Sequence, residues 1–514
     1  MHYSDSMAKV SIITIFDGMR FAPAQLSAEL LRDGHTPQVI VFKRQERVRI
    51  EKLDNPDSDL VRCDLASVAY QIGEQNCLTM DWGVYKKTKP HELRHLKTCL
   101  MDFKPDIIGI TCLTSGMTLA EEIITFLREH FQQPIIWGGV GATIEPERAI
   151  RSADVVCVGE GEEVIRELAA KVDRRESLTD IAGTWARLPS GEIIKHPHRA
   201  SIPLDDIAIP VYDPKYYVQI NGRLFNYAPP LYVPSDDSPN YLIMTQRGCP
   251  FSCSFCIESF YQEEFGKKDS LKRRSVQVVL DELHQAKAMG YKGISFFDDV
   301  FTIHPRWMKE FLPRYKKEIG LPFWCYTYPT THNPETLRQL KEAGCTAITM
   351  GIQSGSERIL QDVYTRPTKP NRVLEAAIEL DQSGIQQVSF DMIPRTDFDK
   401  EEDLRQTLDL LRHLPKRLRI NPYSKLSIMP NYPINRAYEN KDLLTTSEDL
   451  PESLYMYYFK LFYLARVESF DEKTFDRILA DPSYRADHHR LNPFLPMERE
   501  NIDHQNPVAA AKAC

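Results

Sequence analysis

The first third of the chain alternates short apolar runs with amphipathic stretches. Apolar, β-branched runs lie at residues 10–16, 38–42, 107–111, 135–139 and 155–159. Helical periodicity lies between them, at residues 23–33, 91–103, 119–130 and 162–170. This alternation is typical of a parallel sheet with helices on both faces. We therefore predict an α/β fold, with a doubly wound, flavodoxin-like domain over residues 1–175 and an insertion or long loop at 44–90.

The same alternation returns in the second half of the chain. Predicted strands lie at residues 241–244, 293–297, 323–326, 347–350, 388–392 and 425–428. Predicted helices lie between them, at residues 275–289, 305–318, 334–343, 371–383 and 401–413. Because a closed barrel of eight strand–helix units takes about 250 residues, these six units predict a partial (β/α)6 barrel over residues 240–430. A Pro- and Asp-rich linker or wrapping segment at 176–239 precedes it, and a small, mostly helical region at 431–514 follows it.

Composition and charge narrow the function classes. Of the 514 residues, 42% are hydrophobic and 26% are charged, as in ordinary globular proteins. The net charge of −8 does not favour nucleic acid or an anionic membrane as a partner. We find no apolar run of the roughly 18 residues that a transmembrane helix needs, and no signal-peptide pattern in residues 1–9. Eleven cysteines are too few for a disulfide scaffold, so we expect a reducing, cytoplasmic setting.

Three of the cysteines stand together directly after the strand predicted at 241–244. Cys249, Cys253 and Cys256 have the spacing Cys-x3-Cys-x2-Cys. Thiolates are soft ligands that select iron–sulfur clusters, zinc or Cu(I). A four-iron cluster usually takes four cysteines, so three would leave one iron open to a small molecule. A structural zinc site would need a fourth Cys or His, and the next is His284. Unliganded cysteines are the remaining alternative.

The loop Cys-Pro-Phe-Ser-Cys-Ser-Phe-Cys, placed after a strand that opens a partial barrel, resembles the radical S-adenosylmethionine (radical SAM) superfamily. The aromatic Phe255 before the third cysteine also matches. The resemblance covers about residues 240–430. It implies a [4Fe-4S] cluster on Cys249, Cys253 and Cys256, whose open iron binds SAM. It further implies reductive cleavage of SAM to methionine and a 5′-deoxyadenosyl radical, with electrons from a low-potential donor such as flavodoxin or ferredoxin.

Polar residues at two other strand ends agree with this resemblance. Asp298 and Asp299 end the second barrel strand, where the family places polar or acidic groups that hold the SAM amino group. Gln353 and Ser354 belong to Gly-Ile-Gln-Ser-Gly-Ser, which resembles the family segment GIESGS that meets the ribose and methionine parts of SAM. Gln353 stands where many relatives have Glu, and it brings no charge. From the residues alone, the aspartates could also cap a helix or lie in a solvated loop, and 351–356 could form a tight turn.

Glycines and hydroxyl residues follow three strands of the predicted N-terminal domain. Because an open α/β sheet binds ligands at the carboxyl ends of its strands, these loops predict a nucleotide-like or other large cofactor. Glycine lets such a ligand approach the backbone, and hydroxyls and amides bond its polar edges. A flavodoxin-like domain without a ligand is the alternative. The candidate contact residues are Thr111, Thr114, Ser115, Gly138, Gly139, Gly141, Thr143, Gly159, Glu160 and Gly161.

The order of an α/β domain, a linker and a radical SAM barrel resembles the cobalamin-binding radical SAM enzymes. The strings GGVGATIEPE at 138–147 and VVCVGEGEE at 155–163 look like their signatures. The resemblance implies cobalamin in the N-terminal domain. Domains of the methionine-synthase type carry Asp-x-His-x-x-Gly, whose histidine ligates cobalt, whereas residues 16–21 here read Phe-Asp-Gly-Met-Arg-Phe. We therefore predict cobalamin with neither its own base nor a protein histidine below cobalt, which favours transfer of the methyl group as a radical.

These resemblances imply an enzyme that methylates an unactivated carbon of a small molecule, lipid or peptide. The 5′-deoxyadenosyl radical would take a hydrogen from the substrate, and methylcobalamin would then deliver a methyl group. Two alternatives stay open: a cyclase or rearrangement enzyme without net methyl transfer, and a non-catalytic cobalamin or redox sensor. The aromatic segment 455–459 could close the site or simply pack as a helix. Candidate substrate contacts, each also open to a packing or salt-bridge role, are Tyr326, Tyr328, Asp391, Arg395 and Tyr423.

Overall fold

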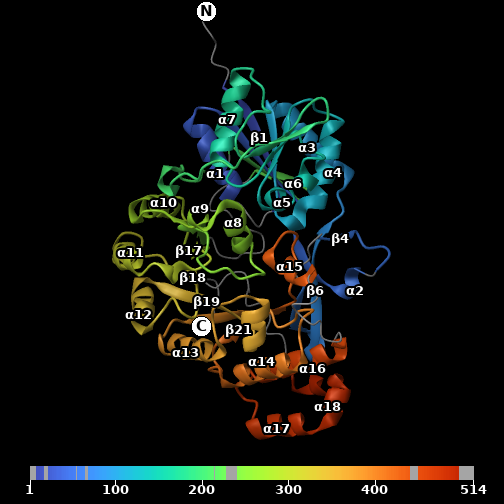
Figure 1. Ribbon diagram of the computed structural model, residues 1–514, viewed down its shortest axis with the longest axis vertical. Helices are drawn as coiled ribbons and strands as arrows, with labels where there is room; N and C mark the ends of the chain where they lie inside the picture. Colours follow the sequence, from blue (N-terminus) through green and yellow to red (C-terminus); the bar gives the residue numbers. More distant parts are fainter. Residues whose placement is uncertain are drawn as a thin grey trace, which may run out of the picture. The chain divides into compact units, whose positions relative to one another are not determined.

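The computed structural model describes residues 7–16, 21–53, 55–63, 68–213, 215–226, 240–439 and 450–496. The chain forms two compact units (Figure 1). The first comprises residues 1–66 and 83–233, and the second comprises residues 67–82 and 234–514. The short segment 67–82 therefore belongs to the second unit, although both of its neighbours in sequence belong to the first.

A mostly parallel sheet forms the centre of the first unit. Its described strands run in the order β11-β10-β9-β8-β7-β1-β2-β12-β13. The inner strands β9, β8, β7, β1, β2 and β12 pair in parallel. Strands β10, β11 and β13 add antiparallel pairs at the two edges. The predicted α/β class is thus confirmed. The strands are β1 (Lys9–Ile15), β2 (Thr36–Phe42), β7 (Ile107–Thr111), β8 (Ile135–Gly138), β9 (Val155–Cys157), β10 (Thr184–Arg187), β11 (Ile193–Lys195), β12 (Tyr217–Ile220) and β13 (Leu224–Asn226).

Amphipathic helices cover this sheet. Helix α4 shows why: it buries Ala120, Ile123, Ile124 and Leu127, which share one helical face. The described residues of the Pro- and Asp-rich segment at 176–239 also contribute to the sheet, because β10 and β11 extend one edge and β12 and β13 extend the other. The helices are α1 (Phe21–Arg32), α3 (Pro90–Phe103), α4 (Met117–Arg128), α5 (Val140–Ile144), α6 (Pro146–Ala149) and α7 (Glu162–Asp173).

The described residues of 44–90 form regular structure, which corrects the prediction of an insertion or long loop. Strand β6 pairs antiparallel with β5 through residues 77–81 and with β4 through residues 84–86. Strand β5 also pairs with β22 (Tyr423–Ser424), far away in sequence. Local patterning did not reveal these elements because most of them have five residues or fewer and because their pairing is partly non-local. They are β3 (Glu46–Arg49), α2 (Ile50–Leu53), β4 (Leu60–Arg62), β5 (Ala69–Gly73) and β6 (Cys77–Lys86).

The second unit contains a six-stranded parallel sheet in chain order, β14-β17-β18-β19-β20-β21. Five strands lie where the sequence predicts them. The sixth prediction, at 425–428, is wrong. Lys425 forms only a bridge with Arg395, and Leu426 is buried outside the sheet. The strands are β14 (Asn240–Ile243), β17 (Gly293–Phe296), β18 (Phe323–Thr327), β19 (Cys345–Gln353), β20 (Gln387–Met392) and β21 (Arg419–Ile420).

Helices follow these strands and pack against one another in chain order from α10 to α14 (Figure 1). The short strands β15 (Gln246–Arg247) and β16 (Lys272–Arg273) pair as a small separate sheet. The helices are α8 (Ile257–Phe265), α9 (Lys267–Ser270), α10 (Val276–Ala288), α11 (Pro305–Glu318), α12 (Pro334–Ala343), α13 (Pro370–Gln382) and α14 (Glu401–His413).

The two faces of the parallel sheet differ in chemistry. On the helix-covered face, the rings of Phe296 and Phe323 meet edge to face at 5.3 Å. Because side chains alternate along a strand, Trp324 lies on the opposite face, where its indole N–H donates to Thr349 Oγ1 at 2.9 Å. Thr349 shares a further hydrogen bond with Ser389 at 2.9 Å. A closed barrel fills its interior with apolar side chains, whereas the inner face of this partial barrel is polar and suits a ligand.

The described part of the C-terminal region is mostly helical, as predicted. The aromatic segment 455–459 lies within α16, where Tyr455, Tyr457, Tyr458 and Phe459 are buried, so it packs as a helix. No helix in the described part of the chain has both the length and the apolar character needed to cross a membrane. The C-terminal helices are α15 (Pro433–Glu439), α16 (Glu452–Leu464), α17 (Glu472–Ala480) and α18 (Pro482–Ala486).

Candidate functional site

The three-cysteine loop lies between β14 and α8, at the carboxyl end of the first strand of the parallel sheet. Helix α8 fixes its backbone. The Ser259 hydroxyl donates to the Cys253 carbonyl at 2.6 Å, and the Gln262 amide donates to the Phe251 carbonyl at 3.0 Å. Cys253 is buried, and Cys249 and Cys256 are half-buried. The three thiols therefore project from a backbone that is held in one conformation.

Gly248 turns the chain into this loop. Its φ is +86°, a conformation that side chains rarely adopt. A Cβ atom at this position would lie 1.9 Å from the carbonyl oxygen of Ser270. The close approach of two backbone segments therefore requires glycine directly before the first cysteine.

Aromatic rings pack against the loop. Phe255 meets Tyr364 edge to face at 4.7 Å, and Phe251 stacks on Tyr328 at 4.0 Å. The Tyr364 hydroxyl donates to the Ile393 carbonyl at 2.8 Å, so its ring is held at both ends. Phe255, predicted to contact the cofactor, thus lies between two cysteines and packs on a fixed ring. Tyr328, a predicted substrate contact, packs on the cysteine loop.

Burial separates the two predicted aspartates. Asp298 is fully buried, and its carboxylate accepts hydrogen bonds from the Thr245 backbone at 2.6 Å and the Gln246 backbone at 2.9 Å. It therefore fixes the turn that precedes the cysteine loop. Asp299 is exposed, yet protein surrounds it closely enough to raise its pKa to about 6, and the Asp298 charge adds to this shift. Of the two, Asp299 is the accessible carboxylate beside the cysteine loop.

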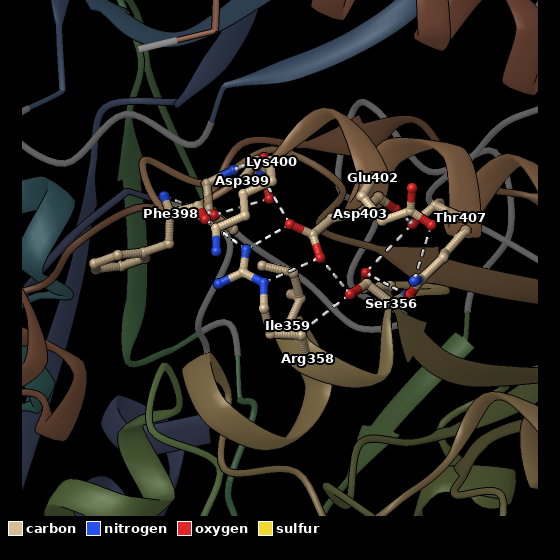
Figure 2. Close-up of polar contacts among 12 residues, drawn as sticks. Ser356, Arg358, Ile359, Phe398, Asp399, Lys400, Glu402, Asp403 and Thr407 are labelled. Carbon is tan, nitrogen blue, oxygen red and sulfur yellow. Dashed lines mark hydrogen bonds and ion pairs between the residues drawn. The ribbon is translucent and has the colours of Figure 1, made fainter. Parts of the chain in front are cut away.

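The segment 351–356 is anchored to helix α14 (Figure 2). The Ser356 hydroxyl donates to Asp403, and the Gly355 backbone donates to Thr407 Oγ1 at 3.0 Å. A Cβ atom on Gly355 would lie 2.5 Å from the Thr407 Cα, so the loop touches the helix directly. Asp403 also pairs with Arg358 at 2.5 Å. These contacts make the end of β19 a rigid platform.

Gln353 and Ser354 lie differently on this platform. Ser354 is buried, and its hydroxyl is 3.3 Å from Thr407 Oγ1, which gives it an anchoring role. Gln353 adopts a left-handed backbone conformation, with φ +62°. Its Oε1 is buried and accepts no hydrogen bond from the described residues. Gln353 thus offers an acceptor to a ligand hydroxyl.

Asp399 lies beside this network (Figure 2), and we expect it to make the stability of the second unit depend on pH. Its carboxyl is buried and accepts hydrogen bonds from the Thr396 backbone at 2.7 Å and the Tyr455 hydroxyl at 3.0 Å. Burial raises its folded-state pKa to about 7, above the value of about 3.9 in an unfolded chain. Because the folded state then binds more protons, the contribution of Asp399 to the free energy of unfolding falls as pH rises from about 4 to about 7, by up to about 4 kcal/mol.

Urea denaturation at several pH values tests this. The free energy of unfolding of wild type minus that of Asp399→Asn should decrease across the interval from about pH 4 to pH 7. The control is Asp409→Asn, because Asp409 is an exposed carboxylate on α14. The corresponding difference for Asp409→Asn should stay within about 0.5 kcal/mol at every pH. A wild-type-minus-Asp399→Asn difference that does not change with pH would contradict the assignment.

The three glycine- and hydroxyl-bearing loops meet at the carboxyl edge of the first unit's sheet. Strand register places Thr111 beside Gly138. The Gly159 backbone donates to Thr143 Oγ1 at 3.1 Å, which joins the second and third loops. The strand order changes direction between β1 and β7, because β2 and β7 flank β1 on opposite sides. Such a switch point is where open α/β sheets bind ligands.

The predicted contact residues on these loops differ in exposure. Gly139 has φ +88°, and a Cβ atom there would lie 2.5 Å from Thr111 Oγ1, so the first two loops approach closely. Thr111, Thr114, Gly141 and Thr143 are buried. The Gly141 backbone donates to the Cys112 carbonyl at 3.0 Å, which joins the first two loops. The half-buried residues, which are the accessible ones, are Ser115, Gly138, Gly139, Gly159, Glu160 and Gly161.

Family comparisons match both regions. Residues 243–411 match the family model described as the radical SAM superfamily, and residues 98–169 match the B12 binding domain. The first match contains the cysteine loop, and the second contains the three loops of the first unit. The chain is a cobalamin-binding radical SAM enzyme. Its cofactors are accordingly a [4Fe-4S] cluster, SAM and cobalamin.

The curated relatives of this radical SAM enzyme are distant. It is 29% identical over 344 residues to an uncharacterised methyltransferase of Pyrococcus horikoshii, covering 66% of this chain and 69% of that one. It is 25% identical to cytidylyl-2-hydroxyethylphosphonate methyltransferase of Streptomyces wedmorensis, over 66% of this chain and 72% of that one. It is 24% identical to anaerobic magnesium-protoporphyrin IX monomethyl ester cyclase of Rubrivivax gelatinosus, over 55% of this chain and 50% of that one.

Two solved structures share the fold of this enzyme. The radical SAM enzyme OxsB, solved with aqua-cobalamin and SAM, matches with a TM-score of 0.62 and 15% identity, over 95% of this chain and 76% of that one. The methyltransferase TsrM of Kitasatospora setae, solved with cobalamin and a [4Fe-4S] cluster, matches with a TM-score of 0.60 and 15% identity, over 83% of this chain and 77% of that one.

The three thiols of this radical SAM enzyme fit a four-iron cluster better than a single ion. Within the described ranges, no three His, Cys, Asp or Glu side chains converge on one metal ion, which leaves the zinc alternative without support. In a four-iron cube each thiolate binds a different iron, so the ligands stand farther apart than around one zinc. Burial raises the pKa of Cys249 to about 12 and also raises the pKa of Cys253 and Cys256. Cluster binding would therefore displace protons from these thiols.

Other residues fit SAM and cobalamin. The acceptor on Gln353 suits a ribose hydroxyl, and the accessible Asp299 carboxylate suits an ammonium group. The half-buried glycines of the first unit leave backbone accessible at the switch point, as a large flat cofactor requires. The predicted lack of a cobalt-ligating histidine concerns residues 17–20, which lie outside the described residues.

The four predicted substrate contacts other than Tyr328 separate into two groups. Tyr326 and Asp391 are half-buried on the inner face of the barrel, and Asp391 accepts a hydrogen bond from Asn421 at 2.6 Å. Tyr423 is instead fully buried, and its ring lies 5.6 Å from that of Phe459. Tyr423 therefore belongs to the packing of α16.

Arg395 belongs to the same packing, because it pairs with Glu452 at 2.6 Å and its guanidinium lies 4.5 Å from the Tyr455 ring.

Sequence reasoning missed two charged residues beside the cysteine loop. Glu258, in the first turn of α8, has a pKa raised to about 8 by burial and then by the Asp299 charge. Its position two residues after Cys256 was a usable signal. Arg366, far along the chain, places Nη1 3.8 Å from the Cys253 sulfur. No local pattern pointed to Arg366, because the π-helical turn Ile359–Val363 that precedes it has no signature in the hydrophobic periodicity.

Proposed function

We propose that this enzyme transfers a methyl group from cobalamin to an unactivated carbon of its substrate. The observation that carries the proposal is the pairing of a radical SAM match with a B12-binding match in one chain, whose relatives include two methyltransferases. When bound, the cluster and SAM supply a 5′-deoxyadenosyl radical, and cobalamin supplies a transferable methyl group. The protein contributes binding, orientation and the exclusion of water.

In this proposal the cysteine loop and two strand ends divide the work. Cys249, Cys253 and Cys256 hold the cluster from a backbone that α8 fixes. Asp299 holds the ammonium group of SAM through a charge-assisted hydrogen bond. Gln353 accepts a hydrogen bond from a ribose hydroxyl on the platform that α14 supports.

The proposed residue roles in the first unit follow from exposure. The buried Thr111, Thr114, Gly141 and Thr143 shape the loops, and the half-buried residues of the same loops contact cobalamin. Below cobalt we propose neither the cofactor's own base nor a protein histidine. Loss of that donor would favour transfer of the methyl group as a radical.

We propose that the substrate, a small molecule, lipid or peptide, lies against the inner face of the partial barrel. Tyr326 and Asp391 offer an aromatic wall and an acceptor there. Burial raises the pKa of Asp391, and the Asn421 amide opposes that shift. An acceptor of this kind suits a substrate that presents an N–H or O–H group.

We also propose a reducing, cytoplasmic setting and a low-potential electron donor such as flavodoxin or ferredoxin. The described cysteines form no disulfide, which agrees with a reducing compartment. Radical SAM chemistry requires a one-electron reductant for the cluster, which the donor would supply.

Labelled SAM tests the proposal. Enzyme reconstituted anaerobically with iron, sulfide and cobalamin is incubated with a protein-free metabolite extract, a reductant and SAM that carries a deuterated methyl group. We expect 5′-deoxyadenosine, S-adenosylhomocysteine and a product that carries the intact label, all detected by mass spectrometry. Cobalamin binding without either SAM product would overturn the proposal and favour a sensor.

A cyclase or rearrangement enzyme is the second candidate function. It is favoured by the similarity to two anaerobic magnesium-protoporphyrin IX monomethyl ester cyclases. The same experiment separates the two functions. A cyclase would form 5′-deoxyadenosine and an altered product that lacks the deuterated methyl group.

A further inference from the structure

A buried arginine lies against the cysteine loop. Arg366 follows the π-helical turn Ile359–Val363, and its backbone N–H donates to the Leu360 carbonyl at 2.7 Å. Only 5% of its surface is exposed. One terminal nitrogen donates to the Gly351 carbonyl, and the other lies 3.8 Å from the sulfur of Cys253. Its side chain thus joins the end of β19 to the second cysteine.

Aromatic stacking holds the guanidinium in this position. The guanidinium carbon of Arg366 lies 4.3 Å from the centre of the Tyr328 ring. Two further contacts hold that ring in place. Tyr328 stacks on Phe251 of the cysteine loop and accepts a hydrogen bond from Thr368. Arg366, Tyr328 and Phe251 therefore form one stack that returns to the loop.

The charge of Arg366 has no carboxylate partner. Among the described residues, no Asp or Glu oxygen lies within 4.0 Å of it, and its Nε makes no hydrogen bond. A buried cation without a counter-charge is costly, so this site needs a negative group. The Cys253 sulfur is the contact that becomes negative, because a cluster ligand is a thiolate.

We infer that Arg366 is a positioning residue that holds the Cys253 thiolate with a buried guanidinium and makes the cluster easier to reduce. The inference rests on the proposed function, in which Cys253 is a cluster ligand. Reduction adds one electron to the cluster, taken from the low-potential donor, so the negative charge beside Arg366 grows. A fixed positive charge and an N–H donor stabilise the reduced form more than the oxidised form.

A redox titration tests this without relying on turnover. Wild type, Arg366→Gln, Arg366→Lys and the control Arg412→Gln are reconstituted anaerobically with iron and sulfide in the absence of SAM. Each is poised at fixed potentials with dithionite and mediator dyes, and electron paramagnetic resonance counts the reduced clusters. Arg412 is the matched control because its guanidinium also lies over an aromatic ring. That ring belongs to Phe475 of the C-terminal helix α17, and its centre is 4.7 Å from the guanidinium carbon.

We expect Arg366→Gln to bind as much iron as wild type, with a ratio of reduced to oxidised cluster that is roughly tenfold lower at a fixed potential. Arg366→Lys keeps the charge and should restore most of that ratio, although it cannot stack in the same way. Arg412→Gln should leave the ratio unchanged. Equal ratios in wild type and Arg366→Gln would overturn the inference.

The amount of iron that each variant binds distinguishes the remaining outcomes. If Arg366→Gln binds little iron, restored loading and a near wild-type ratio in Arg366→Lys support the role of the charge. If both Arg366→Gln and Arg366→Lys fold but neither binds the cluster, the inference is overturned. Arg366 would then act only through its hydrogen bonds to the backbone. Failure of the proposed function looks different, because wild type itself would then lack a four-iron signal or transfer no labelled methyl group.

Discussion

Replacing Cys253 by alanine is expected to abolish cluster assembly and cleavage of SAM. Cys253 is the buried member of the three thiols, and its carbonyl is held by Ser259 of α8. With two thiolates left, the cube has too few ligands to remain bound. Because even the hydrogen-bond partners of a metal ligand cost 10–100-fold when they are removed, we expect 5′-deoxyadenosine formation to fall by more than about 100-fold. Iron and sulfide analysis, with product quantification by mass spectrometry, measures both effects.

The control for this substitution is Cys77→Ala. Cys77 is a half-buried cysteine on the β5–β6 hairpin and belongs to the same unit. It should keep the iron content and the cleavage rate of wild type. Cys253→Ala protein that retains the full iron content would show that Cys253 is no ligand. It would also remove the basis for the role of Arg366.

Replacing Gly248 by alanine is expected to destabilise the second unit and to prevent cluster loading, although it removes no ligand. The new Cβ atom would meet the Ser270 carbonyl oxygen at 1.9 Å, and φ would stay at +86°. Backbone strain of about 1–2 kcal/mol and overpacking of about 1–3 kcal/mol together predict a loss of about 2–5 kcal/mol in the free energy of unfolding. Urea denaturation and iron analysis measure the two effects.

Gly290→Ala separates the clash from the strain. Gly290 has a similar φ of +93°, but a Cβ atom there would meet no atom of the described residues within 4 Å. It should lose only about 1–2 kcal/mol and should load the cluster normally. If both variants lost the same stability and both loaded the cluster, close packing against Ser270 would not matter for the cysteine loop.

Local pattern was enough to predict most of the parallel strands. β7 and β17 are short apolar runs followed by amphipathic helices. The strands that pair with them belong to the same alternation of strands and helices. The elements that the sequence did not predict depend on contacts with residues that are distant in sequence. β21 has only two residues, and β5 pairs with β22 far along the chain. Such elements owe their structure to tertiary contacts, which no window of sequence contains.

The candidate site shows the same division. The cysteine spacing was enough to predict the candidate cluster ligands, because the chemistry of three thiolates is local. The distinction between Asp298 and Asp299 depends on burial, since the first accepts backbone hydrogen bonds and the second is exposed. The approach of Arg366 to Cys253 depends on how a π-helical turn meets a loop more than a hundred residues away. Neither follows from the order of residues alone.

The β5–β6 hairpin has a consequence for synthesis on the ribosome. Its residues 69 and 70 pair with residues 424 and 423, about 350 positions later in the chain. At a translation rate of about 5–20 residues per second, the hairpin waits roughly 20–70 s for its partner strand to be made. During that interval its open edge is a template for wrong pairing, so nascent chains released before residue 424 should aggregate more readily than full-length protein.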